Sequence, residues 1–360
     1  MLAAAPCRTL MRVNAGGAAG MVPCSKSPEP GGRGDPCIRK LTASPAPRHI
    51  RHVDPFLPET PMRLAMPSTL LFGVSLALAT AAVAQAPAAP AAPAPFETTR
   101  VADNVYVFRA GGYQSMFVVT PEGVIATDPI GYANPQAPTL YLQEIRKITQ
   151  APIKYVIYSH HHYDHAAGGK PFKEAGAVFV AHRNAHKRLA ALQSPDVVMP
   201  DMVVDDTGSS IVLGGMRVDL LYVGNNHSDN SLVMLLPRER VLFAVDWIPL
   251  QAVLFRDLAD GYIPDWFAGL DRVLAMEWDR LIPGHPGPGG RLGTKDDVRM
   301  LKDYMTDVSN AARQLAAERK CLNDEAMRAV KLPKYEGWGA YAMFLPGNVE
   351  RFCEYWGRGI

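Results

Sequence analysis

Residues 153–169 read IKYVIYSHHHYDHAAGG, an apolar run that ends in a dense group of polar side chains. The β-branched and aromatic residues of Ile153–Tyr158 predict a buried strand. Directly after it come four potential metal ligands within six residues, at His160, His162, Asp164 and His165. Such a cluster is costly to remove from water unless something compensates it. We therefore expect a metal site at the end of this strand.

The spacing of these residues indicates which of them share an ion. Side chains alternate in an extended chain, so His160 and His162 point the same way and can hold one ion. Asp164 and His165 belong to the following turn and can reach a second ion. His161 points elsewhere and is left out of the predicted site.

Three more candidates follow other predicted strands. His227 comes after a strand predicted over 216–223, Asp246 ends the run 241–245, and His285 follows a short apolar run. The ends of adjacent strands meet at one edge of a sheet, and seven ligands suffice for two metal ions. His182 and His186, spaced i, i+4 on a predicted helix, lack the glutamate of an H-E-x-x-H motif and are interpreted as surface residues.

The pattern His160-x-His162-x-Asp164-His165 resembles the H-x-H-x-D-H signature of the metallo-β-lactamase superfamily. A Gly-Gly pair and the later His, Asp and His follow in the family's order, and the resemblance covers about residues 100 to 300. It implies an αββα sandwich fold and two metal sites. The implied ligands are His160, His162 and His227 for one ion, Asp164, His165 and His285 for the other, and Asp246 as a bridge between them.

The rest of the chain fits an α/β fold. Two groups of short strands, at about 105–128 and 210–245, are each followed by helical patterns, the last of which is a terminal segment near 348–357. Two β-rich halves with helices predict two sheets packed face to face with helices outside. We therefore expect residues 96–360 to form one four-layer αββα domain. Selectivity should reside in loops at the metal edge, where Trp247, Leu254, Phe255, Tyr262 and Trp266 form either a pocket wall or ordinary core.

The first 95 residues are interpreted separately. Residues 62–86 have one positive charge, an apolar run and A-x-A positions, which predict a cleaved secretory signal rather than a membrane anchor. Residues 1–61 are interpreted as a disordered extension or a start-site artefact, and residues 87–95 as an Ala/Pro-rich tether. We expect a periplasmic or secreted protein without a stable membrane anchor.

The charged residues and the cysteines also differ between the predicted leader and the rest of the chain. Nine of the 37 Lys and Arg and four of the 35 Asp and Glu lie at or before Arg63, which leaves a net charge of −3 on the rest. The balance does not favour a nucleic-acid partner. Only Cys321 and Cys353 lie after the signal, and the sequence leaves open whether they pair. It also leaves the oligomeric state open.

The resemblance implies a hydrolase acting on a small-molecule substrate. Two divalent ions acidify a water held between them, and the hydroxide attacks a cyclic amide or ester, a β-lactam or a lactone, or a related ester. Asp164 is expected to orient this hydroxide as the catalytic residue. Five imidazoles and two carboxylates suit two Zn²⁺ ions, although iron and manganese accept similar ligands.

Several features bear on the substrate. Asn226-His-Ser-Asp-Asn230 is similar to the H-[ST]-x-D-N segment of true metallo-β-lactamases. The best-known lactamase subclass, however, has Cys at the position of Asp246, Lys at that of Pro249 and Arg at that of His165. The set of implied metal ligands, with Asp246 as the bridge, is therefore also that of lactonases, glyoxalase II-like thioesterases and alkylsulfatases.

Two further classes stay open. One is an iron-dependent oxidoreductase of the persulfide dioxygenase type, which uses this fold with one iron. The other is a non-catalytic binding protein on the same fold, although such proteins often lose metal ligands and this sequence has all seven. Nucleases of the RNase Z type are disfavoured by the export signal and the acidic charge.

Overall fold

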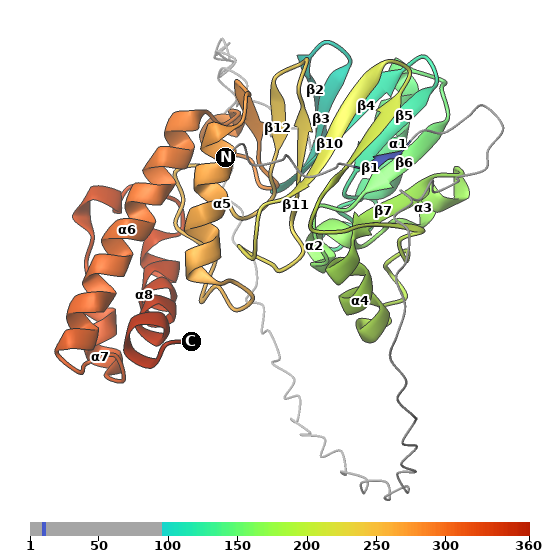
Figure 1. The fold of residues 1–360 in the computed structure, drawn as a ribbon. Coiled ribbons are helices and arrows are strands. Elements are labelled where there is room, and N and C mark those ends of the chain that lie inside the picture. Colours follow the sequence, from blue (N-terminus) through green and yellow to red (C-terminus); the bar gives the residue numbers. More distant parts are fainter. Residues whose placement is uncertain (1–8, 12–95) are drawn as a thin grey trace, which may run out of the picture. The chain divides into compact units, whose positions relative to one another are not determined.

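The computed structural model describes residues 9–11 and 96–360, and these form two β-sheets with helices on their outer faces (Figure 1). One sheet contains, in spatial order, β2 (Phe96–Ala102), β3 (Val105–Ala110), β4 (Tyr113–Thr120), β5 (Gly123–Thr127), β6 (Ile153–Ile157), β7 (Val178–His182) and β8 (Met202–Val204). The other contains β1 (Thr9–Met11), β9 (Ser209–Leu213), β10 (Met216–Tyr222), β11 (Leu232–Leu236), β12 (Val241–Phe243) and β13 (Arg280–Ile282).

Each sheet contains an antiparallel meander that is extended by parallel pairing. In the first sheet β2 to β5 are antiparallel neighbours, and β6, β7 and β8 then add in parallel. In the second sheet β9 to β12 form the meander and β13 pairs in parallel with β12. Parallel neighbours require crossovers, which are α1 (Ala137–Ile148), α3 (Lys170–Glu174), α4 (Arg183–Leu192) and α5 (Ile263–Ala275).

Three apolar layers separate the four structural layers. The middle layer lies between the sheets and takes residues such as Val107 and Met116 from one sheet and Val218 from the other. Neighbouring residues on the same strands, such as Phe108 and Phe117, pack instead against α1, α3 and α4. This alternation is the period of two expected of strands buried on both faces. The predicted αββα sandwich is therefore confirmed.

The outer face of the second sheet is covered by α5 and α6 (Lys295–Ala317), and α8 (Tyr341–Arg358) packs against α6 and α7 (Asp324–Arg328) (Figure 1). A capping box fixes the start of α6, in which Thr294 and Asp297 exchange side-chain to backbone hydrogen bonds. Helix α8 starts at Tyr341, before the segment predicted near Asn348, and it contains Pro346. A proline usually ends a helix, so the sequence pattern placed the start too late.

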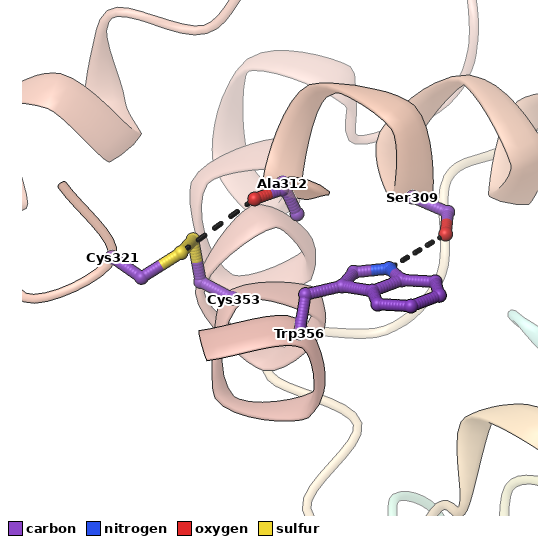
Figure 2. The surroundings of a disulfide bond; sticks show 5 residues. All are labelled: Ser309, Ala312, Cys321, Cys353 and Trp356. Atoms are coloured by element: carbon purple, nitrogen blue, oxygen red, sulfur yellow. Dashed lines mark hydrogen bonds between the residues drawn. A yellow bond between two sulfur atoms is a disulfide. The ribbon is translucent and has the colours of Figure 1, made fainter. Parts of the chain in front are cut away.

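A disulfide joins Cys321 to Cys353 and ties α8 to the segment between α6 and α7 (Figure 2). The two Cα atoms are 5.2 Å apart, and the sequence separation of the cysteines is 32. Beside it, the Trp356 indole donates a hydrogen bond to the Ser309 hydroxyl of α6 at 2.8 Å. The question that the sequence left open is thus answered by a bond that anchors the C-terminal helix.

The structure describes little of residues 1–95. Segments 62–86 and 87–95 and most of 1–61 lie outside the described residues, so these divisions stay predictions. Of the extension, Thr9–Met11 is described and pairs in parallel with β9. Within the described part of the chain, no helix has both the length and the apolarity needed to cross a bilayer.

Candidate metal centre

The first group of histidines gathers at the end of β6. His160 is completely buried, and its Nε2 has no hydrogen-bond partner among the described residues. The Nδ1 of His162 lies 2.9 Å from Nε2 of His227, which sits in the loop after β10. One ring nitrogen of each of the three lies within 4.8 Å of the others, a spacing that one metal ion can serve.

The second group lies beside the first. The short helix α2 (Tyr163–Ala166) carries Asp164 and His165, and His285 follows β13. The Oδ2 atom of Asp164 is 3.7 Å from Nε2 of each of these two histidines. Together with Asp246 they form a second set of side chains that can surround one ion.

Asp246 lies between the two groups. Its Oδ1 is 3.2 Å from Nε2 of His165 and 3.2 Å from Nε2 of His285. Its Oδ2 is 3.6 Å from Nε2 of His160 and 3.6 Å from Nε2 of His227. Each carboxylate oxygen thus faces one group, the arrangement of a bridging ligand.

Strand direction explains why these residues meet. Strands β10, β12 and β13 run in the same direction, so His227, Asp246 and His285 emerge at the same edge of their sheet. Gly284 permits the close approach of its strand end: a Cβ there would lie 2.7 Å from Oδ1 of Asp246. Asp246 itself has a φ of 69°, a conformation that is rare for residues other than glycine and concentrates at functional sites.

The charges of the two groups differ. Burial lowers the pKa of His160 well below its usual range and that of His227 to about 4. Burial also opposes charge on His285, but Asp246 and Asp164 outweigh it and raise its pKa to about 10. Asp246 likewise raises the pKa of His165. The second group therefore carries protons at neutral pH that a cation binding there would displace.

A metal ion fits this donor set. The buried Nε2 atoms of His160 and His165 and the Oδ1 atom of Asp246 have no hydrogen-bond partner among the described residues. Unsatisfied buried polar atoms are costly, and imidazole and carboxylate are ligands of zinc, iron and manganese. All seven residues predicted from the sequence are brought together at this edge.

Two carboxylates orient these histidines and were missed in the sequence. Asp128, which directly follows β5, accepts a hydrogen bond from Ser159 N at 2.7 Å through Oδ1, and its Oδ2 lies 3.3 Å from Nδ1 of His165. Asp260 accepts a hydrogen bond from Nε2 of His162 at 2.8 Å, which leaves Nδ1 of that ring as the lone-pair atom facing His227. Asp128 ends a predicted strand and could have been suspected on that ground. Asp260 lies in an irregular loop that carries no pattern.

Two histidines outside the predicted set are buried. His161 receives a hydrogen bond from the Asn230 amide at Nδ1, and burial lowers its pKa to about 4. Its other nitrogen lies 3.9 Å from Asp260, so His161, His162 and Asp260 form a further group that shares His162 with the first. The prediction that His182 is a surface residue is wrong, because it ends β7, is fully buried and stacks on Tyr222.

A sequence model described as the metallo-beta-lactamase superfamily matches residues 110–285, a stretch that contains all seven residues. The chain belongs to the metallo-β-lactamase superfamily. Members of this superfamily are metal-dependent hydrolases, the enzyme class predicted from the sequence.

Relatives within the superfamily have different names. The alpha subunit of 2,4-dinitroanisole O-demethylase from Nocardioides sp. (strain JS1661) is 23% identical over 52% of this chain and 57% of its own length. The linear primary-alkylsulfatase of Pseudomonas sp. (strain ATCC 19151) is 25% identical over 65% and 53%, and the type 2 metallo-beta-lactamase of Bacillus cereus is 24% identical over 52% and 75%. The chain thus spans little more than half the length of the first two relatives.

Solved metallo-beta-lactamase structures are also similar to part of this chain. A metallo-beta-lactamase from Pontibacter korlensis is 19% identical, and the match covers 58% of this chain and 99% of that one, with a TM-score of 0.49.

Replacing Asp260 tests its role in orienting His162. We expect Asp260→Asn to weaken zinc binding by about 10- to 100-fold, the usual cost of losing a carboxylate that orients a histidine ligand. Calorimetric titration of zinc measures the affinity, and the ¹⁵N shifts of the His162 ring report its tautomer. The exposed carboxylate of Asp271 on α5 is the control, and Asp271→Asn should bind zinc as the unchanged protein does. Equal affinity and an unchanged tautomer in Asp260→Asn would show that Asp260 does not position the ring.

Proposed function

We propose that the chain is a secreted hydrolase with two Zn²⁺ ions that cleaves a cyclic amide or ester, or a related ester. The observation that carries this proposal is the placement of Asp246, with one carboxylate oxygen toward each histidine group. Such a carboxylate can hold two ions side by side. Bound there, the two ions would acidify a water toward neutral pH and polarise the scissile bond.

The side chains of the site have separate tasks. Asp164 lines the cavity at the second group and is placed to accept a hydrogen bond from the attacking water and to orient it. Its pKa is lowered, because the nearby His285 and His165 outweigh the effect of burial, so it is ionised at neutral pH. Tyr113 also lines the cavity, with its ring 4.8 Å from that of His285, and covers one side of the second group.

The cavity favours an ester or lactone over a β-lactam. Pro249 lines it at the position where the best-known lactamase subclass has a lysine that holds the substrate carboxylate. Among the described residues that line the cavity, Arg256 is the only lysine or arginine. It is exposed, and its guanidinium lies 5.2 Å from the centre of the Phe255 ring. Hydrolysis of a sulfate ester is the second candidate, supported by the alkylsulfatase relative.

The secreted location is also part of this proposal. The disulfide between Cys321 and Cys353 supports it, because such bonds persist in oxidising compartments and are rare in the cytosol. Expressed in a bacterium with a C-terminal tag, the chain should be recovered from the periplasm with a new N-terminus after Ala84 or Ala86. Recovery only from the cytosol with the leader intact would contradict the location.

Removing the bridge tests the reaction. We expect the wild-type chain to carry two zinc ions and to hydrolyse esters or lactones, and Asp246→Asn to lose at least one ion and at least 100-fold in kcat/KM. The reason is that the amide cannot supply a charged oxygen to both ions. Metal analysis and a screen of nitrocefin, acyl lactones, thioesters and alkyl sulfates measure both effects, with Asp271→Asn as the control.

Two results would overturn the proposal. One is undiminished turnover in protein from which the metals have been removed with a chelator. The other is one iron per chain together with oxygen uptake, which would favour an oxidoreductase of the persulfide dioxygenase type.

A further inference from the structure

A cavity of about 1030 Å³ opens beside the candidate metal centre. Its inner side is formed by candidate ligands such as His162, Asp164 and Asp246. Its size is at the upper end of ligand pockets, which span roughly 300–1,000 Å³, and exceeds what a small cyclic amide or ester alone requires. The space beyond the metals is therefore available to the rest of a substrate.

The wall away from the metals is apolar. It is formed by the loop after β12 and by helix α8, which contribute Leu250, Val253, Phe255, Leu258 and Phe344. Phe255 is 56% exposed, and its ring stands edge-on to that of Phe344 with the ring centres 5.1 Å apart. By contrast, Trp247, Leu254 and Trp266 are buried core residues. An exposed aromatic side chain at a cavity wall favours an apolar partner that displaces water from it.

This wall is held in place by α8. The buried side chain of Asn348 donates hydrogen bonds from Nδ2 to the carbonyls of Leu254 at 3.0 Å and Arg256 at 2.6 Å. Arg351 donates a third to the carbonyl of Gly261 at 2.9 Å. Arg256 has a φ of 50° and Leu258 a φ of 52°, so the loop holds conformations that a free loop rarely adopts. The wall is therefore preformed.

We propose that the substrate is an ester or lactone that carries an extended alkyl or aryl group, and that this group lies along Phe255 and Phe344. This inference rests on the proposed function, because the metal centre places the scissile bond at the inner side of the cavity. The wall supplies contacts that grow with the length of the apolar group and few polar contacts that would fix a compact, hydrogen-bonding substrate. Selectivity thus comes from apolar area.

The test measures binding separately from turnover. We expect straight-chain carboxylates from hexanoate to dodecanoate, which cannot be hydrolysed, to bind the zinc-loaded protein about two- to fourfold more tightly for each added methylene that the wall covers. Calorimetric titration gives the affinities. Phe255→Ala should flatten this dependence, whereas Ile148→Ala, which removes an exposed apolar side chain at the end of α1, should leave it unchanged. The kcat/KM values of p-nitrophenyl esters from acetate to dodecanoate should rise in parallel.

The possible outcomes separate the two proposals. Affinities that do not depend on chain length, in protein that still hydrolyses short esters, would overturn this inference and leave the proposed hydrolase standing. Affinities that rise with chain length, without hydrolysis of any ester or lactone, would support the apolar wall and contradict the proposed reaction. If Phe255→Ala and Ile148→Ala reduce the gain in affinity per methylene equally, the alkyl group of the ligand does not lie along Phe255.

Discussion

The carboxylate of Asp246 is the constraint on which the rest of the site depends. It is almost enclosed, with 7% of its side chain exposed, and four imidazoles surround it at 3.2 to 3.6 Å. A charge removed from water must be compensated, and His165 and His285, whose pKa values are raised by Asp246, can supply positive charge beside it. Metal ions would compensate it better, since they would also satisfy the buried nitrogens of His160 and His165 that have no hydrogen-bond partner within the described part of the chain. The strand directions and Gly284 serve to bring these groups to one edge.

The sequence predicted the parts of this arrangement that depend on period and spacing. Alternation along strands such as β3 and β4 places residues in two different apolar layers, so short apolar runs between turns were sufficient to predict two packed sheets. The spacing of His160 and His162 depends on the same period. The resemblance to the superfamily, and not spacing, implied the full division of seven ligands into two sets with Asp246 between them, and the structure places these side chains in groups that could each hold an ion.

Other features depend on contacts between distant segments and could not be predicted. Asp260 meets His162 across 98 residues of chain, and no local pattern marks it. His182 was taken for a helical surface residue, although it ends a strand and is covered by Tyr222. The early start of α8 was hidden by Pro346, and this helix holds the loop that carries Phe255. The sequence predicted metal ligands at one edge of a sheet. The cavity beside them could not be predicted, because its apolar wall is held in place by the packing of α8.

The proposed hydrolase requires that the Asp246 carboxylate join two metal ions. It is tested most directly by a crystal structure of the purified chain with anomalous diffraction data collected at the zinc edge. Two anomalous peaks are expected about 3.5–4 Å apart with the Asp246 carboxylate between them, one peak near His160, His162 and His227 and the other near Asp164, His165 and His285. A single peak, whether zinc or iron, or two peaks that Asp246 does not join, would contradict it.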